Sequence, residues 1–217
     1  DTLWVGRLDV TDTPAVRDVV NRAFAELGRV DVIVNNAGYG LFGAAEELTD
    51  EQIGQVIATN LIGSIQVTRA ALPHLRAQGG DRIIQLATYG GQATNPGASL
   101  YHAGKWGIEG FMESTAKDVA PFGIEVTIVE PGGARTEFRF DSLQLASIAS
   151  TATAGLCGIS TLTCCASKYL SSGGHSMIGN SDGASVLIAD VKVPVPEREE
   201  DQVSEHVAHT SSVGPSS

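Results

Sequence analysis

The sequence contains few cysteines and no long apolar segment. Its 217 residues include three cysteines and no CxxC pair, which favours a reducing compartment and argues against a structural zinc site. No apolar run approaches the roughly 18 residues that a membrane span needs. We therefore expect a cytoplasmic protein with no membrane span and no metal site. Because the chain begins at Asp1 rather than at methionine, we also expect a processed product or a fragment.

Positive charge is scarce as well. Lysine and arginine number 14 against 25 aspartates and glutamates, a net charge of −11 without any basic cluster. A surface of this charge repels a phosphate backbone, so we expect no nucleic-acid partner. With 42% hydrophobic and 18% charged residues, the chain has the composition of a globular domain rather than of a disordered one.

The composition changes near residue 140. Residues 141–217 hold 20 serines and threonines in 77 positions, whereas residues 1–140 hold 14. Of the 12 aromatic residues, 11 lie before residue 141. We therefore predict one folded domain over residues 1–140, followed by a divergent Ser/Thr-rich segment, 141–217, that is poorly ordered or irregular.

Strand and helix patterns alternate regularly in the first 140 residues. Capping residues before apolar residues at helical spacing predict helices over 13–28 and 49–78. A third helix is predicted over 99–120. Short apolar runs predict strands over 3–10, 30–34, 83–87 and 124–129, and a further strand over 185–195. This alternation is typical of βαβ units. The predicted fold class is α/β, with a doubly wound, Rossmann-like parallel sheet.

Four of the predicted strand ends carry polar or small residues. They are Asp9-Val10, the segment 35–38, Thr88, and the segment 131–134. Ligands of an open parallel sheet bind beyond the carboxyl ends of its strands. We therefore expect these four strand ends to converge on one ligand.

Tyr101 and Lys105 lie four residues apart in a predicted helix, so they share one helix face. An unperturbed tyrosine titrates near pH ~10 and is a poor acid or base at neutral pH. A nearby ammonium group lowers that pKa toward a useful range. The alternative is an exposed Tyr–Lys pair on a surface helix, without chemical function.

Asn60 and Thr88 are two further polar candidates. Asn60 falls on the apolar face of the helix predicted over 49–78, and an unpaired buried amide costs about 1–3 kcal/mol. We therefore expect Asn60 to have a partner, which for a purely structural residue would be a helix-bending or inter-helix hydrogen bond. Thr88 places a hydroxyl at a strand end, where it either serves chemistry or caps the following loop.

In kind and order, these residues resemble the short-chain dehydrogenase/reductase family. The resemblance covers about residues 3–138. It rests on Asp9-Val10, NNAG at 35–38, Asn60, YHAGK at 101–105 and PGGART at 131–136. It implies an oxidoreductase that transfers a hydride between NAD or NADP and a secondary alcohol or ketone.

The resemblance also implies a role for each catalytic candidate. Tyr101 would give a proton to a carbonyl or take one from an alcohol. Lys105 would hold the nicotinamide ribose and lower the Tyr101 pKa. Thr88, where the family usually has serine, would bind the substrate oxygen, and Asn60 would hold a water that relays protons.

The implied cofactor-binding residues are spread along the chain. Asp9 and Val10 would meet the adenine edge, and Asn36 would lie beside the adenosine ribose. Ala134 and Thr136 would meet the nicotinamide carboxamide. Tyr101 and Lys105 complete this set, and the choice between NAD and NADP stays open.

Two parts of the family pattern are not recognised. No glycine-rich phosphate loop precedes Asp9, so we expect an N-terminally truncated domain. In the family's sheet, the strand of that loop lies beside the one equivalent to 30–34, which we therefore expect to be an exposed apolar edge. After Phe140 the family's substrate-loop helices are not recognised either.

Two functional hypotheses remain open. One is an active dehydrogenase acting on a small-molecule carbonyl or alcohol. The alternative, based on the missing phosphate loop, is a catalytically inactive fragment or a non-enzymatic dimerisation module. Under both, the resemblance implies a homo-oligomer formed through the helices predicted over 49–78 and 99–120.

Overall fold

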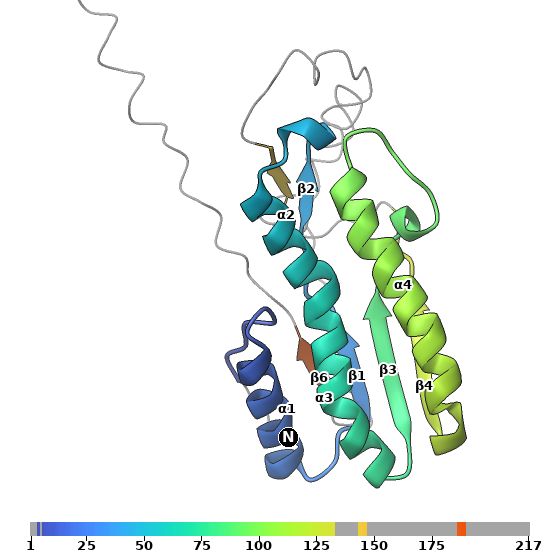
Figure 1. Cartoon of the computed structure of the whole chain (residues 1–217). Helices are drawn as coiled ribbons and strands as arrows, with labels where there is room; N and C mark the ends of the chain where they lie inside the picture. The colour runs from blue at the N-terminus through green and yellow to red at the C-terminus, as the bar shows by residue number, and fades with distance from the viewer. Residues whose placement is uncertain (1–3, 5, 133–142, 147–185, 190–217) are drawn as a thin grey trace, which may run out of the picture.

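A computed structural model describes Trp4 and residues 6–132, 143–146 and 186–189 (Figure 1). Four parallel strands form the main sheet in the order β4-β3-β1-β6. They are β1 (Val32–Asn35), β3 (Asp81–Leu86), β4 (Ile124–Val129) and β6 (Val186–Ala189). The predicted fold class, α/β with a Rossmann-like parallel sheet, is confirmed.

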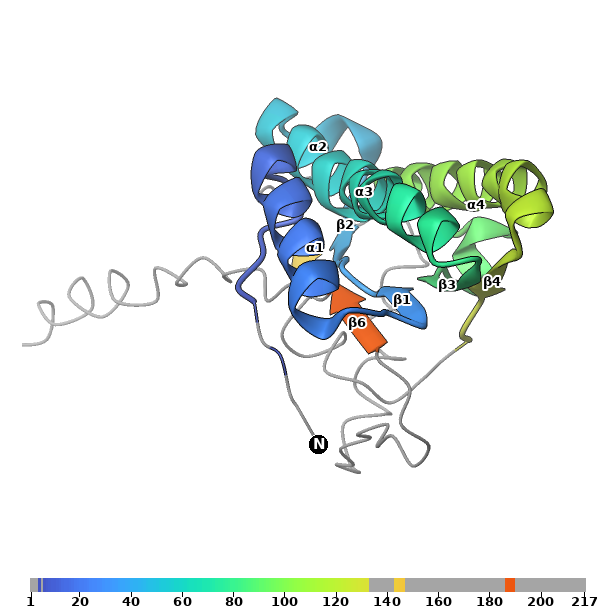
Figure 2. The same ribbon diagram turned by 90° about the horizontal axis from the view of Figure 1, so that it is seen from below.

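The helices among the described residues lie side by side on one face of this sheet (Figure 2). They are α1 (Thr13–Leu27), α2 (Asp50–Ile57), α3 (Ser64–Ala77) and α4 (Ser99–Val119), with a π-helical segment, η2 (Ala58–Gly63), joining α2 to α3. No helix in the described part of the chain is long and apolar enough to cross a membrane.

Local sequence signals set the helix boundaries. Asp12, one residue before the predicted cap, accepts a hydrogen bond from the backbone of Ala15 and begins α1. Thr49 and Gln52 form the predicted capping box at the start of α2. These bonds satisfy backbone N–H groups that have no partner within a helix.

The hydrophobic core lies between the helices and the sheet. One set of alternating strand residues is buried there, including Ile33 and Ile83. They contact apolar side chains of α1, α3 and α4, including Val16, Ala71 and Met112. Every second side chain of the strands and the apolar side chains at helical spacing, 3.6 residues per turn, therefore pack into one core.

The strand predicted over 3–10 is not formed. Among the described residues of this segment, Trp4 and 6–10, none is in a strand. The side chain of Val10 is buried against Gly63, where a Cβ would lie 2.7 Å from Val10 Cγ2. Val10 is thus buried without strand pairing, because a strand needs a neighbour and the described sheet ends at β6.

The prediction of an exposed edge at the strand over 30–34 is also wrong. All four residues of β1 pair in parallel with β6, from Val32 opposite Val186 to Asn35 opposite Ala189. The carbonyl of Ala189 accepts hydrogen bonds from the backbone N–H groups of Asn36 and Ala37. A strand from the far end of the chain therefore satisfies this edge. Of the strand predicted over 185–195, residues 186–189 form β6, and the other residues lie outside the described part of the chain.

A second, two-stranded parallel sheet was not predicted. It pairs β2 (Gly40–Phe42) with β5 (Leu143–Leu145), and Ala146 N–H donates to Phe42 O. Both β5 and β6 belong to the segment predicted as irregular, 141–217. Apart from Ala146, the remainder of that segment lies outside the described residues, so its division from the first domain stays a prediction.

Candidate active site

Three elements bring the four catalytic candidates together. Asn60 lies in η2, Thr88 follows β3, and Tyr101 and Lys105 lie on α4. All four side chains are buried. α4 lies close to η2 at this point, since a Cβ at Gly104 would lie 3.4 Å from Asn60 Cβ.

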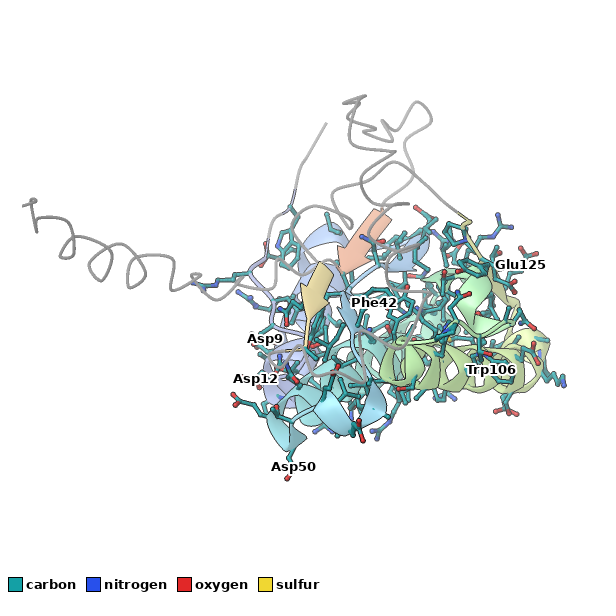
Figure 3. The ribbon with its side chains drawn as sticks, turned by 90° about the horizontal axis from the view of Figure 1, so that it is seen from above. Asp9, Asp12, Phe42, Asp50, Trp106 and Glu125 are labelled. Carbon is teal, nitrogen blue, oxygen red and sulfur yellow. The ribbon has the colours of Figure 1, made fainter. Side chains whose placement is uncertain are left out.

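Tyr101 and Thr88 are joined by a side-chain hydrogen bond. Burial raises the pKa of Tyr101 to about 12, and the bond from Thr88 offsets part of this rise. The ring of Phe42 lies 6.0 Å from the Tyr101 ring, centroid to centroid, on the side of β2. Phe42, the last residue of β2, is labelled in Figure 3. Because its pKa is raised, the Tyr101 phenol is protonated at neutral pH, as a proton donor must be.

Lys105 is 5% exposed, and its Nζ donates to Leu86 O at 2.9 Å. Burial lowers the pKa of Lys105 to about 8, against an opposing effect from Glu109. Its Nζ lies 5.9 Å from the centroid of the Tyr101 ring. The expected lowering of the Tyr101 pKa by Lys105 is not observed, because the ammonium faces a backbone carbonyl and burial dominates at Tyr101.

Asn60 has the partner that its burial requires. Its Nδ2 donates to Tyr39 O at 2.8 Å, and its Oδ1 accepts from Tyr39 N–H at 3.0 Å. Next to this pair, a Cβ at Gly38 would lie 3.2 Å from Asn60 Oδ1 and 3.7 Å from Lys105 Nζ. The NNAG segment therefore reaches the site through a position without a side chain.

The predicted adenosine-binding residues are less closely grouped. Asp9 is exposed, and its Oδ1 accepts hydrogen bonds from the backbone and the hydroxyl of Thr11. Figure 3 shows Asp9 next to the start of α1. The side chain of Val10 is buried in the core, and that of Asn36 is exposed. Ala134 and Thr136 lie outside the described residues.

Two buried polar residues of α4, His102 and Glu109, were missed. They lie seven residues apart, which places them on one helix face. This seven-residue spacing, together with the apolar residues Ile108 and Met112 on the buried side of the helix, was a signal in the sequence. Among the described residues, no group of three or more histidine, cysteine or acidic side chains could hold a metal ion.

A family model described as short chain dehydrogenase matches residues 1–144. The chain belongs to this family. It is 39% identical over 141 residues to "Oxidoreductase BOA17" of Botryotinia fuckeliana, covering 65% of this chain and 52% of that protein. It is 38% identical over 131 residues to a "3-ketodihydrosphingosine reductase" of Bacteroides thetaiotaomicron, covering 60% and 49%. This short-chain dehydrogenase chain thus spans about half the length of these relatives.

Solved structures of the same family resemble the fold. A short-chain dehydrogenase from Streptomyces avermitilis matches with a TM-score of 0.68 and 36% identity, over 76% of this chain and 63% of that chain. Carveol dehydrogenase from Mycobacterium avium in complex with NAD matches at 0.56 and 32%, over 58% and 46%. A metagenomic short-chain oxidoreductase in complex with NADP matches at 0.57 and 30%, over 60% of each chain.

Proposed function

We propose that this chain is an NAD(P)-dependent oxidoreductase that transfers a hydride between the nicotinamide and a secondary alcohol or ketone. The observation that carries the proposal is the buried Thr88–Tyr101 hydroxyl pair beside Lys105. Two hydroxyls at one point can both bind a single carbonyl oxygen, one as proton donor and one as hydrogen-bond donor.

The residues present fit the nicotinamide end of the cofactor. Lys105 is a buried ammonium with three N–H donors, and within the described residues it has one hydrogen-bond acceptor, Leu86 O. Gly38 leaves space next to Lys105 Nζ and Asn60 Oδ1. Both features suit a ribose diol, and similar structures hold NAD in one case and NADP in another.

In the reduction direction, Tyr101 gives its proton to the substrate oxygen. Its raised pKa keeps the phenol protonated until that transfer. Thr88 holds the same oxygen and orients the carbonyl toward the nicotinamide, which supplies the hydride when bound. Lys105 holds the ribose with the N–H groups that its bond to Leu86 O leaves over. In the oxidation direction, the same groups act in reverse order.

Asn60 contributes by fixing the backbone around Gly38. Its two bonds to Tyr39 hold the segment after NNAG against η2, and we propose that it also orders a proton-relay water next to Lys105. For the rest of the cofactor, we retain Asp9, Val10 and Asn36 at the adenosine end. Ala134 and Thr136 are retained at the carboxamide.

We also propose a homo-oligomer formed through the helices α2–η2–α3 and α4. Ile53, Ile62 and Trp106 on these elements are 39%, 41% and 52% exposed. Figure 3 labels Trp106 on α4 and Asp50 at the start of α2. Burial of these exposed apolar side chains against a second copy of the chain would favour self-association. The cytoplasmic location predicted from the cysteines stays part of this proposal.

One observation favours the alternative, an inactive chain. β6 is paired with β1 at the edge where, in the family's sheet, the strand of the phosphate loop lies. A chain that keeps β6 at this position cannot also pair that strand there. Cofactor binding therefore separates the two hypotheses.

The direct test is a thermal melt of the purified chain with saturating NADH or NADPH. A ligand that binds only the folded state raises the melting midpoint. We expect a rise with one of the two cofactors, and a smaller rise with Lys105→Met, which lacks the ribose donor. No rise with either cofactor would refute the proposal and favour the inactive chain.

A further inference from the structure

His102 connects α4 to the loop that follows Thr88. The imidazole is 6% exposed. Its Nδ1 lies 2.7 Å from Gly90 O, and its Nε2 lies 2.9 Å from the backbone nitrogen of Asn95. Both ring nitrogens are therefore engaged by one segment, residues 88–95, which we call the 88–95 loop.

These two partners fix the protonation state of the ring. A backbone N–H can only donate, so Nε2 must accept from Asn95. A carbonyl can only accept, so Nδ1 must carry the proton that is donated to Gly90. His102 is therefore neutral, with its proton on Nδ1. A second proton, on Nε2, would face the Asn95 N–H and break that bond.

The contact at Gly90 leads directly to Thr88. A Cβ at Gly90 would lie 2.9 Å from both Cε1 and Nδ1 of His102, so the ring packs against the glycine backbone. The N–H of the same glycine donates to Thr88 Oγ1 at 3.4 Å. The position of Gly90, which His102 sets, thus affects the hydroxyl that bonds Tyr101.

A second side chain of α4 holds the same loop. Glu109 Oε2 accepts from Gln92 Nε2 at 2.5 Å, and a Cβ at Gly91 would overlap the Glu109 carboxylate. Within the loop, Asn95 Nδ2 donates to the hydroxyl of Tyr89. The 88–95 loop therefore rests on α4 at two points, two helical turns apart, and His102 is the one nearer to Tyr101 in sequence.

We propose that His102 is a positioning residue, which holds the Thr88 hydroxyl in place against Tyr101 by binding Gly90 and Asn95. This inference rests on the function proposed above. Because Tyr101 and His102 are consecutive on α4, the helix that carries the proton donor also sets the position of the group that binds the substrate oxygen. A 1 Å displacement in such a site costs about 100-fold in rate.

The test uses three substitutions of His102 in the full chain. His102→Phe keeps the ring and removes both hydrogen bonds. His102→Asn keeps a donor near the position of Nδ1, facing Gly90, and His102→Gln keeps an acceptor near the position of Nε2, facing Asn95. His74→Phe is the matched control, because His74 is also hydrogen-bonded, to the side chain of Asn21, but lies on α3 against Phe24 of α1.

We expect His102→Phe to lower kcat for ketone reduction about 100-fold, with an unchanged Kd for the cofactor and an unchanged far-ultraviolet spectrum. His102→Asn should recover most of the loss, since Gly90 is the link to Thr88. The single variant Thr88→Ala and the double variant that combines Thr88→Ala with His102→Phe should have the same kcat. Independent, multiplying losses, or full activity of His102→Phe, would overturn the proposal.

A second measurement does not depend on turnover. In NMR spectra of the labelled chain, we expect His102 Nδ1 to be protonated and Nε2 to be unprotonated. His102→Phe should displace the Thr88 methyl resonance and speed hydrogen exchange at the Asn95 amide, whereas His74→Phe should do neither. If wild type shows no turnover but these shifts appear, the proposed function fails and the positioning stands. An unmoved Thr88 resonance overturns the positioning itself.

Discussion

Asn60 and Tyr39 are joined by two hydrogen bonds, one to the carbonyl and one to the N–H of the Tyr39 backbone. The side-chain amide of Asn60 thus pairs with both backbone groups of a buried residue 21 positions away. Tyr39 lies between Gly38 and β2, which begins at Gly40. This pair therefore connects the NNAG segment to the helical layer that carries the active site.

Asn60→Ala removes both partners and leaves two buried backbone groups unpaired. We expect the free energy of unfolding to fall by about 2–4 kcal/mol, since each unsatisfied buried group costs about 1–3 kcal/mol. Urea denaturation measures this change. Asn21→Ala, at an exposed position, should change stability by less than about 0.5 kcal/mol. A loss at Asn60 as small as that at Asn21 would contradict the structural role.

Lys105 should make stability rise with pH. Its pKa is about 8 in the folded protein and ordinarily 10.5, so between these values the unfolded chain binds more protons and the free energy of unfolding increases. Below pH 8 the buried charge costs on the order of 3 kcal/mol. Above about pH 10 Tyr101 acts in the opposite sense, because its pKa is raised from 10.0 to about 12 and the unfolded chain loses that proton first.

The measurement is the free energy of unfolding from pH 7 to 10 for wild type and Lys105→Met. We expect the variant to lose the part of the rise between pH 8 and 10 that belongs to Lys105. Lys117→Met, at an exposed position of the same helix, should keep the wild-type slope. Equal slopes for wild type and Lys105→Met would show that Lys105 is not buried as a charge.

Gly38→Ala should weaken cofactor binding. The added Cβ lies 3.2 Å from Asn60 Oδ1 and 3.7 Å from Lys105 Nζ, and overpacking of this kind costs about 1–3 kcal/mol. We expect the Kd for the preferred cofactor, measured by fluorescence titration, to rise about tenfold, which is 1.4 kcal/mol. Gly110→Ala, in α4 and with nothing within 4 Å, should leave Kd unchanged and add about 0.5–1 kcal/mol of stability. An unchanged Kd for Gly38→Ala would place the ribose elsewhere.

Trp106→Glu should weaken the proposed oligomer. Trp106 is half-exposed on α4, and a charge at that position opposes burial in an interface. Sedimentation velocity should show a shift toward monomer for this variant. Phe122→Glu is the matched control, because Phe122 is 46% exposed but follows α4, in the turn before β4. A monomeric wild type, or an equal effect of both variants, would contradict the proposed interface.

The sequence predicted the elements whose signals are local. The cap at Thr49, the apolar periodicity of α1 and the bounds of β4 agree with the structure because neighbouring residues determine them. The pairing of β6 with β1 and of β5 with β2 was missed. These contacts join residues more than 100 positions apart, and no local pattern reports which strand lies beside which.

The candidate site shows the same division. The positions of Tyr101 and Lys105 follow from helical spacing, and the burial of Asn60 required a partner. The identity of that partner, the backbone of Tyr39, depends on the π-helical turn η2, which has no distinct sequence pattern. The raised pKa of Tyr101 was not predicted either, because burial is a property of the packed structure.

The central claim is that Tyr101 transfers the proton that accompanies hydride transfer. It is tested most directly with NADH or NADPH deuterated at the transferred position and a panel of ketones, followed by mass spectrometry of the alcohols formed. We predict deuterated alcohol with wild type at saturating cofactor, and about 100-fold to 10,000-fold less with Tyr101→Phe. No deuterium transfer by wild type, or equal transfer by Tyr101→Phe, would contradict the account.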